Sequence, residues 1–129
     1  MPAASKLTVV VVDDQMTIRT LVRTGLNQIA INDVREFGVA EEALKHIKVH
    51  APNVVISDFN MPGMDGLALL QGIRADVKLK STAFILLTGR ADKELVQRAV
   101  QLGANNYLVK PFNIATLKQK IEQVVGALT

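Results

Sequence analysis

The chain has 129 residues, of which 49% are hydrophobic and 21% charged, a composition typical of one globular domain rather than a disordered chain. It contains no cysteine, which excludes disulfides and thiolate metal sites, and no apolar run approaches the roughly 20 residues that span a bilayer. Its net charge of only +3 and its 4% aromatic residues disfavour nucleic-acid binding. We therefore expect a single cytoplasmic domain over 1–129, with about 1–6 as an N-terminal tail, no DNA partner and no membrane insertion.

In the first half of the chain, apolar runs alternate with segments of helical period. The run at 9–12 predicts a buried strand, and apolar residues spaced by three and four predict a helix over about 15–29. A short strand at 34–37 and a second helix follow, and the run at 54–58 predicts another buried strand. The second helix is marked by Ala40, Ala43, Leu44 and Ile47.

The second half continues the same alternation. Asp65 has the short acidic side chain that suits a helix N-cap and is expected to open the third helix. Strands are predicted at 84–87 and 107–109, with a fourth helix between them, which Gly103 is expected to end, and a fifth helix after them. The apolar positions that mark these three helices are Leu67, Leu70 and Ile73; Leu95, Ala99 and Leu102; and Ile114, Leu117, Ile121, Val124 and Leu128.

This order is a β-α unit repeated five times. Strands that are apolar throughout, rather than alternating, indicate a parallel sheet covered by helices on both faces. Because crossovers between parallel strands are right-handed, few topologies remain. We predict an α/β, flavodoxin-like (βα)5 fold, a doubly wound five-stranded parallel sheet in the order 2-1-3-4-5. Such sheets bind ligands outside the carboxyl ends of their strands, next to the switch point between strands 1 and 3.

Polar groups follow four of the predicted strands at this edge of the sheet. Asp13 and Asp14 follow the first strand, Asp58 ends the third, Thr88 follows the fourth and Lys110 follows the fifth. Three crowded carboxylates repel one another unless a cation neutralises them, and oxygen ligands suit Mg²⁺. A phosphoryl group on Asp58 would share that metal and accept hydrogen bonds from the threonine and the lysine. The pattern makes Asp58 a candidate phosphoryl acceptor that forms a labile acyl phosphate.

Each of these groups taken alone has an ordinary explanation. An acid pair after a strand often caps a helix, an aspartate or a threonine can simply end a strand, and Lys110-Pro111 can be a strand stop. Four such groups at one edge of the same sheet are hard to obtain by coincidence. The pattern therefore favours a site.

Four motifs together resemble the receiver domains of response regulators. They are Val11-Val12-Asp13-Asp14, residues 56–66 (ISDFNMPGMDG), Leu87-Thr88 and Val109-Lys110-Pro111-Phe112. The resemblance covers the whole chain, and residues 58–62 and 115–117 are most similar to the family's single-domain chemotaxis regulators. It implies a stand-alone bacterial two-component regulator. Such a protein is a signalling switch and not an enzyme, apart from phosphoryl transfer to, and loss from, its own aspartate.

The resemblance implies a role for each acidic residue of the site. Asp58 would accept phosphoryl from a phosphohistidine of a sensor histidine kinase or a histidine phosphotransfer protein. Asp14 and Asp58 would bind Mg²⁺ directly, together with the main-chain carbonyl of Asn60. Asp13 would act on the metal through water.

The resemblance also implies an output. Thr88 would move toward the phosphoryl group, Lys110 would pair with it, and Tyr107 would rotate inward on activation. The Lys110-Pro111 bond is expected to be cis. The face formed by the fourth helix, the fifth strand and the fifth helix would contact a downstream protein, the flagellar motor switch or another effector. The regulator itself is expected to be a monomer.

Three residues depart from the chemotaxis regulators or bear on the lifetime of the phosphoryl group. Phe59 stands where those regulators have tryptophan, so an intrinsic fluorescence signal is missing. Asn60 and Arg90 lie two residues after Asp58 and Thr88, at positions that tune phosphoryl lifetime in the family. Arg90 can reach the phosphoryl group or face solvent, and the sequence favours neither.

Two other sets of residues leave alternatives open. His46 and His50 have the i, i+4 spacing of metal ligands, but no third ligand is evident and Lys48 between them favours a solvated face. Arg98 and Lys118 belong either to an ordinary solvated surface, which is favoured, or to a docking face for an acidic partner.

Two other functions fit parts of the pattern. A phosphate relay or sink would use the same site without a bound effector. A haloacid-dehalogenase-like phosphatase would also form an aspartyl phosphate. It usually needs an aspartate two residues after its nucleophile, where this chain has Asn60.

Overall fold

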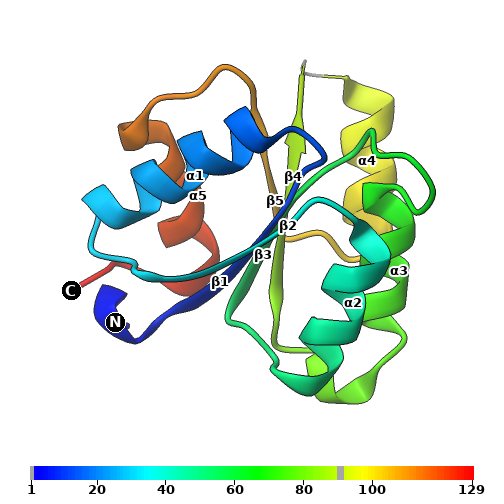
Figure 1. The fold of residues 1–129 in the computed structure, drawn as a ribbon, viewed down its shortest axis with the longest axis horizontal. Coiled ribbons are helices and arrows are strands. Elements are labelled where there is room, and N and C mark those ends of the chain that lie inside the picture. The colour runs from blue at the N-terminus through cyan, green and yellow to red at the C-terminus, as the bar shows by residue number, and fades with distance from the viewer. Residues whose placement is uncertain (1, 90–91) are drawn as a thin grey trace.

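A computed structural model of the chain describes residues 2–89 and 92–129, which form a three-layer α/β fold (Figure 1). Within these ranges, five strands alternate with five α-helices in the predicted order, and no helix has the length and apolarity needed to cross a bilayer. The strands are β1 (Thr8–Val12), β2 (Asp33–Phe37), β3 (Val54–Asp58), β4 (Ala83–Thr88) and β5 (Asn106–Val109). The α-helices are α1 (Met16–Gln28), α2 (Ala40–Val49), α3 (Gly66–Arg74), α4 (Lys93–Gln101) and α5 (Ile114–Val125), and η1 (Ala4–Lys6) and η2 (Val77–Leu79) are short 3₁₀ helices.

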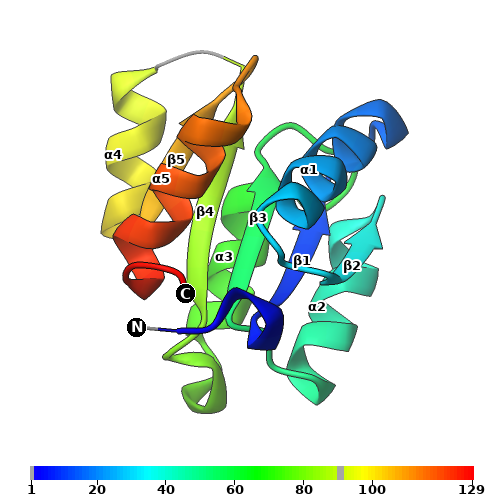
Figure 2. The same ribbon diagram turned by 90° about the vertical axis from the view of Figure 1, so that its left-hand side faces the viewer.

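The sheet has the predicted topology. All neighbouring strands pair in parallel in the order β2-β1-β3-β4-β5, which confirms the flavodoxin-like fold. Helices α1 and α5 cover one face, and α2, α3 and α4 cover the other (Figures 1 and 2). Because Val12 of β1 is paired with Ser57 of β3, the next residues along the chain, Asp13 and Asp58, lie side by side at the carboxyl edge of the sheet.

Burial on both faces explains why the central strands β1, β3 and β4 are apolar except at their ends. In β1, Val9 and Val11 belong to the core under α1 and α5, whereas Val10 and Val12 belong to the core under α2, α3 and α4. All four valines are at most 1% exposed. A central strand with two buried faces leaves its polar groups only at its ends, which is where the acidic residues stand.

The structure confirms two of the predicted helix ends and contradicts a third. Asp65 caps α3, its Oδ1 accepting a main-chain N–H at 2.8 Å, and Gly103 follows the last turn of α4 with a φ of 107°, so both predictions are confirmed. Leu128 lies beyond α5 rather than within it. The helix ends at Val125 because Gly126 takes a φ of 91°, outside the helical region. Leu128 still packs against the core.

The two ends of the chain lie together (Figure 2). The Ala4 N–H donates to the Thr129 carbonyl at 3.2 Å, and the Thr129 N–H donates to the Pro2 carbonyl at 3.0 Å. Ala4 is buried and belongs to the core cluster under α1 and α5. This junction is on the amino side of the sheet, away from the acidic residues.

Candidate functional site

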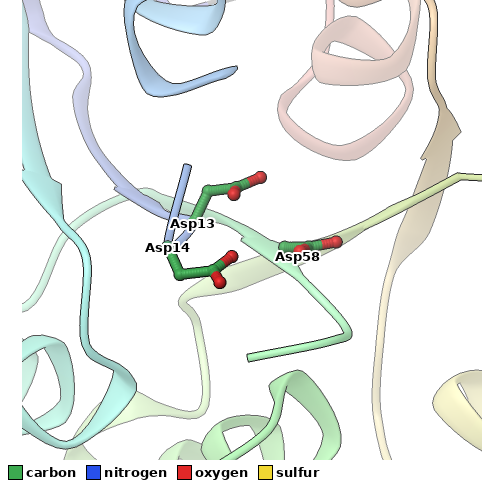
Figure 3. A group of neighbouring side chains, drawn as sticks. All are labelled: Asp13, Asp14 and Asp58. Carbon is green, nitrogen blue, oxygen red and sulfur yellow. The ribbon is translucent and has the colours of Figure 1, made fainter. Parts of the chain in front are cut away.

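Three aspartates meet at the carboxyl edge of the sheet, and their side chains project in the same direction (Figure 3). One carboxylate oxygen from each of Asp13, Asp14 and Asp58 lies within 4.8 Å of the others. Within residues 2–89 and 92–129, no other group of three or more His, Cys, Asp or Glu side chains is close enough to share an ion. Asp13 is fully buried, Asp58 is 8% exposed and Asp14 is open to solvent. The strand register thus brings together the three acids that the sequence predicted.

Asp13 is held by its neighbours through three of its four polar atoms. Its N–H donates to the Phe37 carbonyl of β2 at 3.1 Å, and its carbonyl accepts from Arg19 Nη1 at 2.7 Å. Its Oδ1 accepts the Gln15 N–H at 2.9 Å, which tightens the turn between β1 and α1. The remaining atom, Oδ2, is buried and accepts no hydrogen bond from the described residues. It lies 3.5 Å from Lys110 Nζ.

Lys110 reaches the acids from the end of β5. Its Nζ lies 3.4 Å from Asp58 Oδ1, and its side chain is only 19% exposed. The Lys110 N–H donates to the Thr88 carbonyl at 2.7 Å, which joins the ends of β4 and β5. The Lys110-Pro111 peptide is cis, as predicted. The lysine ammonium is therefore directed at the side chain predicted to accept phosphoryl.

Asp58 is in an environment that disfavours its ionised form. Burial raises the pKa of Asp58 above its ordinary value, and the negative charge of Asp13 raises it further. Lys110 opposes both effects through its charge and its hydrogen bond, and a main-chain hydrogen bond involving Phe59 does the same. The net direction of the pKa is upward, because burial and the charge of Asp13 together outweigh these opposing interactions.

The donor set suits a hard divalent cation. Three carboxylates face one lysine, so one lysine charge leaves the cluster negative. Mg²⁺ prefers oxygen ligands and completes its shell with water. The buried Oδ2 of Asp13 supplies an acceptor that the described residues leave unsatisfied. The residues present therefore fit Mg²⁺, and Asp13, Asp14 and Asp58 can hold it.

A cavity of about 350 Å³ lies beside the acids, between the loops that follow β3 and β4. Asn60 and Thr88 both line it, with Phe59, Gly89, Asp92 and Leu95. Thr88 ends β4 and is buried, whereas Asn60 is exposed. The structure thus brings Asn60 and Thr88 to the same edge as Asp58. Arg90 lies outside the described residues.

Tyr107 stands on β5 and lines a second cavity, which shares Asp92 with the first. This cavity, of about 320 Å³, is lined by Tyr107 and by Asp92, Lys93, Val96 and Gln97 at the start of α4. Lys120 of α5 places its Nζ 4.5 Å from the centre of the tyrosine ring, a cation–π contact. The ring is half-buried between the two helices. Arg98 on α4 and Lys118 on α5 are both exposed.

His46 and His50 lie at the opposite edge of the sheet from the aspartates. Their rings are 5.1 Å apart and border a cavity of about 430 Å³ beside Asp33 and Arg35. His46 also packs against Phe37, with ring centres 5.2 Å apart. Burial lowers the pKa of His46, and the charges of His50 and Arg35 lower it further. Although this cavity is larger than the two described above, its groups do not form the ion-binding cluster.

Two contacts that support the site were not predicted from the sequence, although Gly66 belongs to the motif at 56–66. Gly66 opens α3, and a Cβ atom there would lie 2.3 Å from the Asp58 carbonyl oxygen, so only glycine allows the helix to begin this close to β3. Arg19 donates to the Asp13 carbonyl from the first turns of α1. No local pattern predicts either contact. Both depend on how a helix is placed against the end of a neighbouring strand.

The sequence profile of the response regulator receiver domain matches residues 9–122. The chain belongs to the response regulator receiver domain family. Receiver domains bind Mg²⁺ through acidic residues, and the aspartate cluster found here can hold such an ion. The membership confirms the resemblance predicted from the four motifs.

Several proteins are similar to this chain over almost its whole length. The "Probable chemotaxis protein CheY" of Rhizobium etli is 47% identical over 128 residues, which are 99% of either chain. The "Chemotaxis protein CheY-3" of Vibrio cholerae is 38% identical over 93% of this chain and 92% of its own. Among solved structures, chemotaxis protein CheY4 of Vibrio cholerae has a TM-score of 0.85 at 34% identity and covers 96% of this chain and 99% of its own. A response regulator from Chloroflexus aurantiacus has a TM-score of 0.87 at 29% identity, with 97% and 98% covered.

Proposed function

We propose that this CheY-like receiver domain accepts a phosphoryl group on Asp58 in a Mg²⁺-dependent reaction and signals through a phosphorylation-dependent protein contact. The donor would be the phosphohistidine of a sensor histidine kinase or a histidine phosphotransfer protein. The observation that carries the proposal is the meeting of Asp13, Asp14 and Asp58 within 4.8 Å, with Lys110 Nζ 3.4 Å from the Asp58 carboxylate. The protein would act in the cytoplasm as a monomer, with one receiver domain over 1–129.

In the proposed reaction, an Asp58 oxygen attacks the phosphorus of the phosphohistidine. A phosphorus–oxygen bond forms as the phosphorus–nitrogen bond breaks, and the imidazole leaves with the electron pair. Such a transfer needs positioning and charge neutralisation more than covalent help. Bound Mg²⁺ would neutralise charge on the phosphoryl oxygens, held by Asp14, Asp58 and the Asn60 carbonyl, with Asp13 acting through water.

Two side chains of this chain would support the transfer directly. Lys110 keeps Asp58 available as a carboxylate against the effect of burial, and its ammonium can then donate to a phosphoryl oxygen. Thr88 borders the cavity beside Asp58 and would donate its hydroxyl to another of these oxygens. Asn60 borders the same cavity, which supports a role in the lifetime of the phosphoryl group. A similar role for Arg90 rests on its sequence position alone.

The output would use the α4-β5-α5 face. Movement of Thr88 toward the phosphoryl group would vacate space for Tyr107 to rotate inward, which would change the surface between α4 and α5 and shift an existing equilibrium. If this face binds a partner, the exposed Arg98 and Lys118 would suit an acidic one. Because the Rhizobium etli and Vibrio cholerae relatives are chemotaxis proteins, we propose a component of the flagellar motor switch as the target, with another effector as the alternative.

Labelling with a small phosphodonor tests the acceptor. Incubation with acetyl phosphate and Mg²⁺ should add one phosphoryl group, located on Asp58 by intact-protein and peptide mass spectrometry. The Asp58→Ala variant should remain unlabelled, and a chelator should suppress labelling of the wild type. Labelling at another residue, or equal labelling of the variant, would overturn the assignment.

A binding experiment tests the output. Capture of the target should increase with an acyl-phosphate mimic such as beryllofluoride, and reversing the charges of Arg98 and Lys118 to glutamate should weaken it. If phosphorylation occurs on Asp58 and no partner binds in either state, the protein is a phosphate sink and the proposed output is wrong.

A further inference from the structure

Arg19 makes two polar contacts at the end of β1, and both point toward a function beyond packing. Its Nη1 donates to the Asp13 carbonyl at 2.7 Å, and its Nε lies 3.4 Å from Glu36 Oε1 on β2. The side chain is only 19% exposed, although it extends from a surface helix. A guanidinium presents its donors in a fixed plane, so two simultaneous contacts fix its position.

The carbonyl that Arg19 holds belongs to the peptide unit between Asp13 and Asp14. Because a peptide unit is planar, fixing this oxygen also fixes the N–H and the Cα of Asp14. The other side of Asp13 is fixed by its N–H bond to Phe37 at 3.1 Å. Asp14 itself is exposed, and its side chain must nevertheless lie within ion-sharing distance of two acids. The orientation of this single peptide therefore decides whether both carboxylates reach the same point.

Gly38 leaves room for the Arg19 guanidinium, and Arg23 helps to fix Glu36, the second partner of Arg19. A Cβ atom at Gly38 would lie 3.1 Å from Arg19 Nη1, so a side chain there would crowd the contact. Glu36 is held on its other oxygen by the Nε of Arg23, whose Nη2 donates to the Val34 carbonyl at 2.7 Å. This contact should hold the carboxylate of Glu36 in place when Arg19 is replaced.

We propose that Arg19 is a positioning residue of the acidic site, which orients the Asp13–Asp14 peptide so that both carboxylates face a divalent cation. This inference rests on the proposed function for the identity of the ion, Mg²⁺. Arg19 touches neither the ion nor the phosphoryl group. It acts through the main chain of the residue that joins the two acids.

Arg23 provides a matched control on the same helix. It also carries a guanidinium paired with Glu36 and donating to a main-chain carbonyl, but its carbonyl belongs to Val34 in β2 and not to the site. The experiment compares Arg19→Gln with Arg23→Gln by calorimetric titration with Mg²⁺, by urea unfolding and by amide NMR shifts without metal. Arg19→Gln should weaken Mg²⁺ binding about 10- to 100-fold, the usual effect of losing a residue that orients a ligand. Arg23→Gln should lose stability without a comparable loss of Mg²⁺ affinity.

Three outcomes decide the inference. Equal Mg²⁺ affinities for the two variants would overturn it, whereas a loss confined to Arg19→Gln that free guanidinium ion partly restores would support it. If the wild type binds no Mg²⁺, the proposed function fails first. The metal-free amide shifts of Asp14 and Gln15 then decide the positioning role, which requires that they move in Arg19→Gln and not in Arg23→Gln.

A second variant covers the case in which Arg19→Gln does not fold. Gly38→Ala keeps the arginine but places a methyl group against its Nη1. We expect this variant to weaken Mg²⁺ binding less than the full substitution would. Wild-type Mg²⁺ affinity and unchanged Asp14 amide shifts in Gly38→Ala would count against the inference.

Discussion

At the level of single residues, Asp58 reduces the stability of the fold that holds it. Burial and Asp13 raise its pKa in the folded state above the ordinary value, and Lys110 compensates only in part. A carboxyl group whose pKa is higher in the folded state binds more protons there than in the unfolded state. The free energy of unfolding therefore falls as pH rises from the pKa of Asp58 in the unfolded chain to its higher pKa in the folded protein. This loss of stability persists at higher pH.

Replacing Asp58 by asparagine should remove this loss. Near neutral pH and without metal, we expect Asp58→Asn to raise the free energy of unfolding by about 0.5–2 kcal/mol, the usual gain from relieving a functional site. The gain should disappear below the ordinary pKa of aspartate, where the carboxyl is neutral in both states. Urea unfolding at the two pH values measures it, with Glu42→Gln on the exposed face of α2 as a control that should change by less than about 0.5 kcal/mol. A destabilised Asp58→Asn at neutral pH would contradict the argument.

At the level of elements, the start of α3 is fixed by its closeness to β3. The Gly66 N–H donates to the Phe59 carbonyl at 2.9 Å, and an added Cβ would lie 2.3 Å from the Asp58 carbonyl oxygen. Gly66→Ala should therefore destabilise the protein by about 1–3 kcal/mol and disturb labelling of Asp58. Gly89→Ala is the matched control. Gly89 lines the cavity of about 350 Å³ beside Asn60 and Thr88, and a Cβ atom there would meet no atom within 4 Å. Equal unfolding midpoints for the two variants in urea would refute the close-approach explanation.

The other end of α3 is fixed by Arg74. Its Nε donates to the Gly103 carbonyl at 3.0 Å and its Nη2 to Asn105 Oδ1 at 2.9 Å, while the same Asn105 oxygen accepts the Phe84 N–H at 2.8 Å. One side chain thus links α3, β4 and the turn before β5. Arg74→Met should lower the free energy of unfolding by about 1.5–3 kcal/mol, the range for hydrogen bonds to a charged group. Because these contacts lie at the amino edge of the sheet, Mg²⁺ affinity measured by calorimetry should not change. A loss of affinity would show that the two edges are coupled.

At the level of the whole molecule, the layers and the acidic edge could be predicted from the sequence because both follow from burial. Strands covered on both faces must be apolar throughout, so polar groups can stand only at their ends, and a parallel sheet brings those ends together. The contacts of Arg19 and Gly66 could not be predicted, since they depend on the placement of a helix against a strand. The end of α5 could not be predicted either. The apolar spacing continues to Leu128, but the conformation of Gly126 ends the helix at Val125.

Ion binding at the acidic cluster would be coupled to the stability of the whole domain. An ion that binds only the folded state stabilises it by about 2.7 kcal/mol at 100 times its dissociation constant. For a domain of this size we expect saturating Mg²⁺ to raise Tm by roughly 5–10 °C over the value in a chelator. Calorimetry with and without Mg²⁺ measures this shift, and KCl at equal ionic strength controls for general screening. An equal shift with KCl would refute specific binding.

The response of Asp58→Asn to Mg²⁺ gives a sharper test of this coupling. Asp58→Asn removes a negative charge from the acidic cluster, and Mg²⁺ would neutralise negative charge at the same place. The stabilising effects of the substitution and of the ion should therefore not add. We expect the variant to start from a higher Tm without metal than the wild type and to gain much less from Mg²⁺. Additive gains would mean that the ion binds elsewhere, because an ion that needs the Asp58 carboxylate cannot stabilise a protein that lacks it by the same amount.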